Sequence, residues 1–412
     1  MLSYKRSSIF AIVMARSVVV LLLTCGLGHQ ARAVDLTFTA EFRPNAANPT
    51  HNKFVNTTPQ SGYCEHWPHL CGDRGFGVAV PIEITFENMD VNGADRNSAY
   101  FQLPTRYRDI RVINSADGSD AAVRWRANVM SLRIDNWGAS GASPAFGGNW
   151  GTYPPAPCAY LGAGIGNGTY YEFGWRLPEN IGPCVKTPLI EMLLPMRTSR
   201  FSVGYELITP DPLAMKNGIY RGDLTLTVGP SGDFDFGDRA TVSDSVVNVH
   251  FELTVQHELR VEFPPGSDRM VLVPEGGWNS WVDHGRLPTR LSRDLPFSLS
   301  SSAPFSITLQ CQYPQSGGDC GLRDITTQAA PEVPVQVAVT MPGFREARRN
   351  VDALNLKLST QGAVAHFTSD TYAANRASRL HFDVTGENVK SILDHPGSQY
   401  RGNVTVVFDA QP

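Results

Sequence analysis

Short runs of alternating apolar and polar residues, separated by turns, dominate this sequence and limit the folds it can adopt. The run Asp35–Phe42 (DLTFTAEF) places Leu36, Phe38, Ala40 and Phe42 on one face, and similar runs recur to the C-terminus. A period of two is the pattern of a strand with one buried face. The 37 glycines and 29 prolines among 412 residues suit many turns. This pattern predicts an all-β protein built of β-sandwiches.

We expect further strands wherever the alternation is clear. These segments are 80–86, 123–134, 189–194, 201–208, 224–228, 246–255, 259–263, 270–273, 305–311, 333–341, 354–358, 364–367, 380–384 and 404–408. Helical periodicity is scarce, and only 344–354 and 389–393 are candidates for short helices. We expect a domain boundary near residues 256–257, because one predicted strand ends just before it and another begins just after it.

The first 33 residues have the features of an export signal. Lys5 and Arg6 precede a short apolar stretch, and 31–33 (ARA) fits a cleavage site. Four of the 35 Lys and Arg residues lie in this leader, so the remaining 31 face 39 Asp and Glu, a net charge of −8. A negative chain without a long basic run makes nucleic acid an unfavourable partner.

Six of the seven cysteines lie beyond the leader. An even number in an exported chain points to disulfides formed in an oxidising compartment such as the periplasm. Six cysteines can pair in many ways, so the sequence leaves the connectivity open. We expect neighbours to pair: Cys64 with Cys71, Cys158 with Cys184, and Cys311 with Cys320. A metal site is disfavoured, because no CxxC occurs and no histidine has zinc-finger spacing from a cysteine pair.

The motif Tyr-Arg-Gly occurs twice, at 220–222 and 400–402, and each copy begins an alternating run. After the first copy another predicted strand follows at 246–255, whereas after the second only 409–412 remain. If the copies are equivalent strands, the first sandwich has its closing strand and the second lacks it. An open sandwich leaves backbone groups and apolar side chains uncovered, and would accept a strand from another chain. The alternative is that both are ordinary strands and the C-terminal fold closes by itself.

The best candidates for ligand binding lie in the first half of the chain. Arginine can pair with an acidic sugar through two hydrogen bonds, and flat aromatic rings suit sugar faces or protein surfaces. The residues that we expect to contact a receptor are Arg106, Arg108, Arg124, Arg126, Trp137 and Trp150; Arg111, Arg133, Tyr153, Tyr170, Tyr171 and Trp175 belong to the same wider set. The competing interpretation is that the aromatic residues are core and the arginines are solvated.

Motifs for catalysis are missing from the sequence. It contains no GxSxG, no HExxH and no phosphate-binding loop, so we expect neither an enzyme nor a cofactor. Three carboxylates lie together at 233–238 (DFDFGD), but their spacing is not that of an EF-hand calcium loop. We favour a polar turn between strands over a calcium site.

Beyond its leader, most of the chain resembles the tip adhesin and pilus initiator subunits of chaperone–usher fimbriae, of the CblD-like or colonization-factor type. The resemblance is carried by the order and spacing of the pair Cys64/Cys71 before 82–86, the pair Cys158/Cys184 before 218–226, and the runs 249–264 and 397–408. It implies a signal peptide at 1–33, a receptor-binding domain at 34–255, and a pilin domain at 256–412. Both domains would be immunoglobulin-like sandwiches in tandem, the second lacking its last strand.

The resemblance also implies partners and a location. These are a periplasmic chaperone, an outer-membrane usher, a next pilin subunit whose N-terminal extension supplies the missing strand, and a host glycan or protein receptor. Tyr400, Val404, Val406 and Phe408 would lie beside the donor-strand groove, and the carboxylate of Pro412 would anchor in the chaperone. We therefore expect a tip adhesin or minor pilin at the pilus tip on the cell surface, which could also initiate assembly.

Two features depart from that pattern. Relatives place two binding-pocket arginines on the strand that matches 224–228, but here the chain continues as Gly229-Pro230, so their receptor chemistry does not transfer. Asp35–Phe42 itself looks like a donor strand. It is either the first strand of the N-terminal domain or, in a fimbrial adaptor or shaft subunit, a strand donated to a neighbour. A secreted carbohydrate-active enzyme is the remote third alternative.

Overall fold

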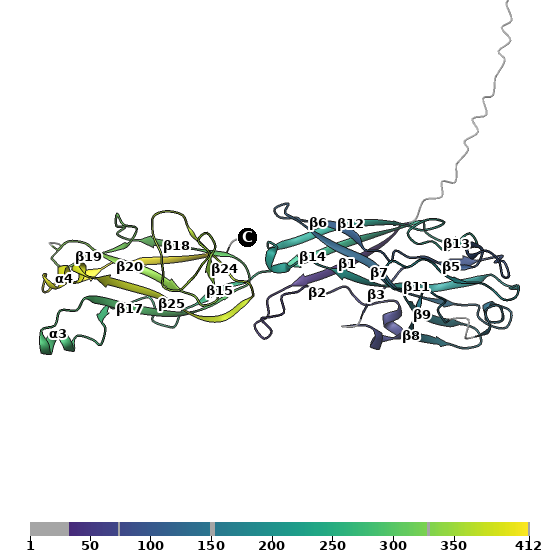
Figure 1. The fold of residues 1–412 in the computed structure, drawn as a ribbon, viewed down its shortest axis with the longest axis horizontal. Helices are drawn as coiled ribbons and strands as arrows, with labels where there is room; N and C mark the ends of the chain where they lie inside the picture. Colours follow the sequence, from purple (N-terminus) through teal and green to yellow (C-terminus); the bar gives the residue numbers. More distant parts are fainter. Residues whose placement is uncertain (1–32, 73–74, 149–152, 328–329, 411–412) are drawn as a thin grey trace, which may run out of the picture.

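The computed structural model describes residues 33–72, 75–148, 153–327 and 330–410. The protein is all-β and consists of two sandwich-like units in tandem along one long axis (Figure 1). One hydrophobic core is built from residues between Val34 and Val255, and a second from residues between Leu291 and Val389. The expected leader up to residue 32, Trp150 and Pro412 lie outside the described residues. Within those residues, no helix combines the length and the apolar character needed to cross a bilayer.

A single curled sheet forms most of the N-terminal unit. Its strands follow the order β13-β4-β11-β7-β6-β12-β14-β1-β2, with β3 also on β11, β9 also on β7, and β8 on β9, while β5 and β10 form a separate pair. The strands are β1 Ala33–Phe42, β2 Val55–Asn56, β3 Phe76–Ala79, β4 Ile84–Phe86, β5 Ala99–Phe101, β6 Arg108–Asn114, β7 Asp120–Ile134, β8 Ala159–Gly166, β9 Tyr171–Arg176, β10 Cys184–Lys186, β11 Met196–Ile208, β12 Gly218–Thr227, β13 Ala240–Val242 and β14 Val246–Val255. The helices α1 Tyr63–His66 and α2 Ala142–Ala145 are single turns.

Strand β1 is built into this sheet. It pairs in parallel with β14 along its whole length, from Ala33 opposite Val246 to Phe42 opposite Val255, and its far edge pairs with β2. Its predicted apolar face points into the core, where Phe38 and Phe42 are fully buried. In this structure, residues 33–42 are therefore a strand of their own unit.

The C-terminal unit has two sheets. One follows the order β15-β17-β25-β20-β19-β26, with β16 on β17 and β23 on β20, and the other the order β22-β21-β24-β18-β27. The elements are β15 Leu259–Glu262, β16 Val273–Pro274, α3 Asn279–His284, β17 Arg290–Ser301, β18 Phe305–Cys311, β19 Cys320–Asp324, β20 Val333–Thr340, β21 Arg345–Glu346, β22 Val351–Asp352, β23 Leu356–Lys357, β24 Ala365–Thr368, β25 Ala373–Thr385, α4 Glu387–Leu393, β26 Tyr400–Arg401 and β27 Val404–Ala410. Leu299 and Val339 from one sheet and Phe305 and Phe367 from the other are fully buried in the core of this unit.

Hydrogen bonds tie the connection at residues 256–258 to both units. The backbone N–H of Gln256 donates to the carbonyl of Phe42 (3.0 Å), and the N–H of Glu258 donates to Ser302 Oγ (2.9 Å). Between them, His257 Nε2 lies 2.7 Å from the carbonyl oxygen of Met215 and Nδ1 lies 3.1 Å from Ser302 Oγ. A carbonyl only accepts, so Nε2 carries the proton and His257 contacts both units. The exact domain boundary at 255/256 stays a prediction.

Of the expected strand 270–273 only Val273 lies in a strand, and two further sequence expectations are wrong. Residues 189–194, expected as a strand, form a loop between β10 and β11 in which Leu193 is 80% exposed. Proline at 188 and at 195 flanks the loop, and proline cannot donate a ladder hydrogen bond. Residues 344–354, expected as a helix, contain the hairpin β21–β22, with Asn350 in a left-handed conformation (φ 53°).

Candidate functional site

The last strand of the chain lies at the edge of its sheet. β27 pairs with β18, from Val404 opposite Cys311 to Ala410 opposite Phe305, and across 33–410, gaps excepted, no strand pairs with its other edge. In the second sheet of this unit β15 is likewise an edge strand, paired only with β17 in the described part of the chain. Each sheet of the C-terminal unit thus ends on one side in β15 or β27, and on the other side in a strand of only two residues, β26 or β22.

Apolar side chains along these two edges are only partly covered. Leu259 and Val261 on β15, and Val404, Val406 and Phe408 on β27, contact the C-terminal core but remain half-buried. We call these five residues the open edge. Three aromatic rings link the two edges. The ring of Phe297 on β17 lies 5.3 Å from that of Phe263, just after β15, and 5.5 Å from that of Phe408 on β27.

The N-terminal unit contains a comparable strand, β12, but there both edges of the strand are paired. β12 begins with the first Tyr-Arg-Gly motif and pairs with β6 on one edge and with β14 on the other, over the full length of β14. The alternating residues of β14 are completely buried; they are Val247, Val249, Phe251, Leu253 and Val255. After β27 the described chain has no counterpart of β14, and this is why the alternating residues of β27 are half-exposed.

The glycines of the two motifs have the same packing role. A Cβ on Gly222 would lie 2.4 Å from the carbonyl oxygen of Arg111 on β6, and a Cβ on Gly402 would lie 2.4 Å from the carbonyl oxygen of Gly321 on β19. Both positions therefore need a residue without a side chain, because a neighbouring backbone comes too close. The repeated Tyr-Arg-Gly has a shared structural reason, which supports treating β12 and the 400–408 segment as equivalent strands.

The arginines expected at a receptor site already have partners within the unit. Arg106 donates to Asn180 Oδ1 (3.0 Å), Arg108 to Asp233, and Arg126 to Glu206 (2.6 and 2.9 Å). Arg124 and Arg126 both lie over the ring of Tyr107, at 4.5 and 5.4 Å.

Burial differs widely within this set. Arg126 is 7% exposed and Trp137 2%, whereas the side chains of Arg108 and Arg124 are each nearly half-exposed. Burial alone would raise the pKa of Glu206, but hydrogen bonds from Tyr107 and Arg126 outweigh it and hold this pKa below its usual value. Of the predicted residues, the structure brings the arginines together around β6 and β7 and places Trp137 in the core. Their role in receptor binding stays a prediction.

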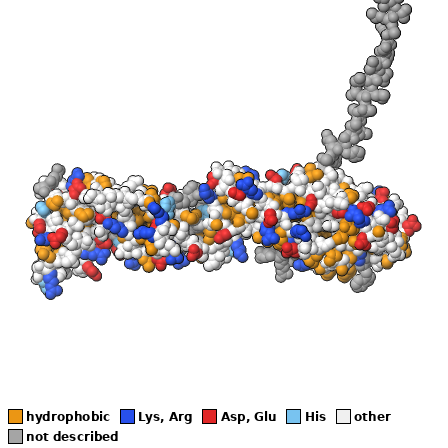
Figure 2. All heavy atoms as spheres, turned by 45° about the horizontal axis from the view of Figure 1, so that its top comes forward, with side chains coloured by type: hydrophobic (Ala, Val, Ile, Leu, Met, Phe, Trp, Pro, Cys, Tyr) orange, Lys and Arg blue, Asp and Glu red, His pale blue; other side chains and the backbone are white. Residues whose placement is uncertain are grey.

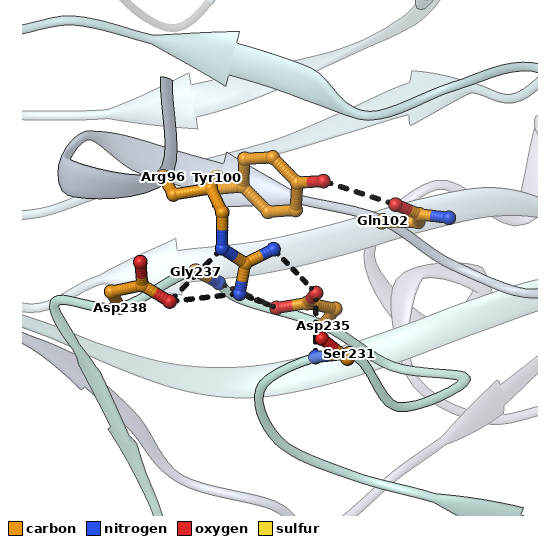
Figure 3. A network of polar contacts seen from close by, with 7 residues as sticks. All are labelled: Arg96, Tyr100, Gln102, Ser231, Asp235, Gly237 and Asp238. Carbon is orange, nitrogen blue, oxygen red and sulfur yellow. Dashed lines mark hydrogen bonds and ion pairs between the residues drawn. The ribbon is translucent and has the colours of Figure 1, made fainter. Parts of the chain in front are cut away.

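The acidic loop at 233–238 is tied down by arginine (Figure 3). Asp235 is buried and accepts from Arg96 Nη1 (2.8 Å) and from the backbone N–H groups of Ser231 and Gly237, each at 2.9 Å. Asp238 also accepts from Arg96, at 2.9 Å from Nη2. Burial would raise the pKa of Asp235, but these hydrogen bonds lower it below its ordinary value. Among the residues that the structure describes, no group of three or more His, Cys, Asp and Glu side chains is arranged to hold a metal ion.

Sequence reasoning missed one cluster in the N-terminal unit. His66 on α1, Glu172 on β9 and Arg200 on β11 come together from three distant segments, with Arg200 Nη1 2.7 Å from His66 Nε2. No spacing in the sequence connects them. The clearest signal is the backbone of Arg200, which has φ 51° within a strand and can be seen only in the structure.

Three disulfides join neighbours in the sequence: Cys64–Cys71, Cys158–Cys184 and Cys311–Cys320. Basic and acidic side chains are interspersed over the visible face of both units (Figure 2).

No protein-family model matches the chain, and no curated protein matches it by sequence. Among solved structures it is similar to CfaE, the adhesive subunit of the CFA/I fimbria of enterotoxigenic Escherichia coli, with 10% identity, coverage of 92% of this chain and 95% of that chain, and a TM-score of 0.29. A chain of the CsuC–CsuE chaperone–tip adhesion subunit complex of Acinetobacter baumannii has 9% identity, coverage of 92% and 98%, and a TM-score of 0.21. The CupB6 tip adhesin of Pseudomonas aeruginosa has 11% identity, coverage of 80% and 94%, and a TM-score of 0.25.

These structures are of tip adhesins of chaperone–usher pili, the class that the sequence resembles.

Proposed function

We propose that this protein is a tip adhesin of a chaperone–usher fimbria. Its N-terminal unit presents a receptor-binding surface, and its C-terminal unit joins the fibre by accepting a strand from the next subunit. The observation that carries the proposal is the contrast between the units. The N-terminal sheet contains β14, whereas the equivalent position beside β27 is vacant in the described chain.

The geometry of β14 indicates how a donated strand would sit. β14 runs antiparallel to β12, so a strand in the same place on β27 would run antiparallel to β27 and start near the junction of the units. It would satisfy the free backbone groups of the edge and cover Val404, Val406 and Phe408. Fully burying a side chain of this size contributes about 1.5–3 kcal/mol, and these three are already half-buried, so each would contribute about half as much.

The place of β1 favours the tip over an adaptor position. To serve as a donor, β1 would have to leave a ladder that spans all ten of its residues and expose Phe38 and Phe42. A subunit whose own first strand is used internally can end a fibre, because it needs only to accept a strand.

The assembly partners follow from the same edge. A periplasmic chaperone would cover β27 before assembly, with the carboxylate of Pro412 as an anchor, and an usher would pass the subunit to the cell surface. The receptor is a glycan or a protein, and the exposed residues Arg106 before β6, Arg108 on β6 and Arg124 on β7 remain candidates to contact it. The protein would act by binding and not as an enzyme.

The test uses the full chain and a ten-residue peptide with the sequence of its own β14, 246–255. The peptide should raise the melting temperature by several degrees, since a ligand that binds only the folded state stabilises it. Amide hydrogen exchange should slow along β27 and stay unchanged along β12. A control peptide with the alternating apolar residues replaced by serine should do neither. No change along β27 with any apolar alternating peptide would contradict the proposal.

A further inference from the structure

Arg200 has a backbone conformation that disfavours its own side chain. It lies within β11 at φ 51°, where the register with β7 shifts between Ser199 and Ser202. The other described non-glycine residues with positive φ are Ser231 and six asparagines. Asparagine tolerates this region because its short side chain bonds locally to the backbone, whereas a long side chain is unfavourable there. Backbone outliers of this kind are enriched at functional sites.

The irregularity in β11 aims Arg200 at two polar residues. Its Nη1 lies 2.7 Å from His66 Nε2 and 3.4 Å from Glu172 Oε2, while His66 Nδ1 lies 3.1 Å from Glu172 Oε1. A guanidinium can only donate, so His66 Nε2 accepts from Arg200 and the imidazole proton is on Nδ1, facing Glu172. Each of the three side chains thus contacts the other two, and both Arg200 and His66 face the Glu172 carboxylate.

The Glu172 carboxylate is buried, and the Arg200 guanidinium is at the surface. The Glu172 side chain is 3% exposed and the Arg200 side chain 47%. Among the described residues, Arg200 Nε and Nη2 have no hydrogen-bond partner. This pair of N–H groups is the edge that binds a carboxylate or sulfate through two parallel hydrogen bonds.

The surroundings hold the cluster in place and add a second cation. The Cys64–Cys71 disulfide closes the turn that carries His66. On β7, Arg133 is the register partner of both Ser199 and Glu172, so it lies between the strands of Arg200 and Glu172. The guanidinium of Arg133 lies over the ring of Tyr170 at 3.9 Å, and its Nε is paired with Asp135 at 2.6 Å. The unpartnered edge of Arg200 and a nearby aromatic ring suit an acidic sugar, and Arg133 adds positive charge that Asp135 partly offsets.

We propose that Arg200, positioned by His66 and Glu172 and flanked by Arg133 and Tyr170, binds the anionic group of an acidic sugar. The group is a carboxylate or a sulfate, since both match the free guanidinium edge. The proposal names a ligand class for the N-terminal unit, and it rests on the proposed adhesin function. A purely structural ion pair would use Nη1 alone and would not explain why the position has an arginine whose Nε and Nη2 have no partner among the described residues.

The test measures binding of three probes to the full chain by calorimetry or by NMR titration: 3′-sialyllactose, 3′-sulfolactose and lactose. At least one anionic probe should bind ten or more times tighter than lactose, and the affinity should fall as salt rises. Preference for the sialylated probe would identify a carboxylate, and preference for the sulfated probe a sulfate. Equal binding of all three would overturn the proposal.

Variants separate binding from folding. Arg200→Gly suits the left-handed backbone and should lose at least tenfold in affinity for the anionic probe while the protein stays folded. Arg200→Lys keeps the charge without the fork and should lose less. Arg221→Ala, an exposed arginine on β12 that pairs with Glu252, is the control and should bind normally. Unchanged affinity in a folded Arg200→Gly protein would sink the proposal. The peptide experiment on β27 does not involve Arg200, so the two proposals can fail separately.

Discussion

The ring of Phe408, on the last strand of one sheet, lies 5.5 Å from the ring of Phe297 in the other sheet, at an interplanar angle of 63°. Edge contacts of this kind add to the free energy gained from burial. Phe408 also lies 6.3 Å from Phe305, so it connects the two layers of the C-terminal unit at the open edge. The edge strand β27 is thus already part of the core.

Replacing Phe408 by alanine should therefore weaken the unit twice. Without the peptide, Phe408→Ala should lower the free energy of unfolding by about 1–3 kcal/mol. This is less than for a fully buried phenylalanine, because the ring is half-exposed. It should also reduce the stabilisation by the β14 peptide. Urea unfolding with and without peptide measures both effects. Val407→Ala, whose side chain faces away from this core, should change stability by less than about 0.5 kcal/mol; equal effects of the two variants would contradict the role of Phe408.

Arg96→Ala should strongly destabilise the N-terminal unit. Asp235 is buried and depends on Arg96 for two of its hydrogen bonds, so removing the arginine leaves a buried carboxylate without its counter-charge. Such losses cost about 3–5 kcal/mol. Arg106→Ala on the same unit removes only exposed contacts to Asn180 and should cost less than about 1 kcal/mol. Thermal unfolding of both variants checks the prediction, and a mild effect of Arg96→Ala would show that water replaces the arginine.

Much of the fold was predictable because alternation reports burial directly. Strands β14 and β18 match the expected ranges 246–255 and 305–311 residue for residue, and β1 differs only at its start. The run 189–194 misled because apolar composition does not show whether a backbone has a ladder partner. The repeated Tyr-Arg-Gly was informative because, in both units, a neighbouring backbone lies too close to its glycine to allow a side chain.

The sites were less predictable, because they depend on contacts between distant segments. Alternation correctly places Arg124 and Arg126 on one side of β7, and both contact Tyr107. It could not show that Glu206 from β11 and the carbonyl of Leu177 cover Arg126 and not Arg124. His66, Glu172 and Arg200 are far apart in sequence, and the left-handed backbone that distinguishes Arg200 has no sequence signature.

His250 should make the N-terminal unit more stable in acid than a variant without it. Its Nδ1 lies 2.6 Å from Asp223 on β12 and its Nε2 lies 3.6 Å from Asp35 on β1, and hydrogen bonding to Asp223 raises its pKa. The folded state therefore holds the proton more tightly than the unfolded state. This stabilisation is full below about pH 6.5, the usual histidine pKa, and is lost as pH rises through the raised value. His250→Gln should remove this pH dependence in urea unfolding; an unchanged profile would count against it.

His257 should have the opposite dependence at the junction. Burial lowers its pKa, outweighing its hydrogen bonds to Met215 and Ser302, so the folded state favours the neutral ring. The unfolded state then binds a proton first, and stability should fall as pH drops below about 6.5 toward the lowered folded pKa. His257→Gln can still donate to the carbonyl of Met215 but does not titrate, so it should be less sensitive between pH 7.5 and pH 5. Because protonation of His250 stabilises the fold and protonation of His257 destabilises it, each variant is compared with the parent chain, and the double variant should show neither trend.

A second experiment measures the distance between the units. A spin label on each unit would show whether the distance distribution between the units widens in acid for the parent and stays narrow for His257→Gln. If the distance distribution of the parent does not change with pH, protonation of His257 does not alter the arrangement of the two units.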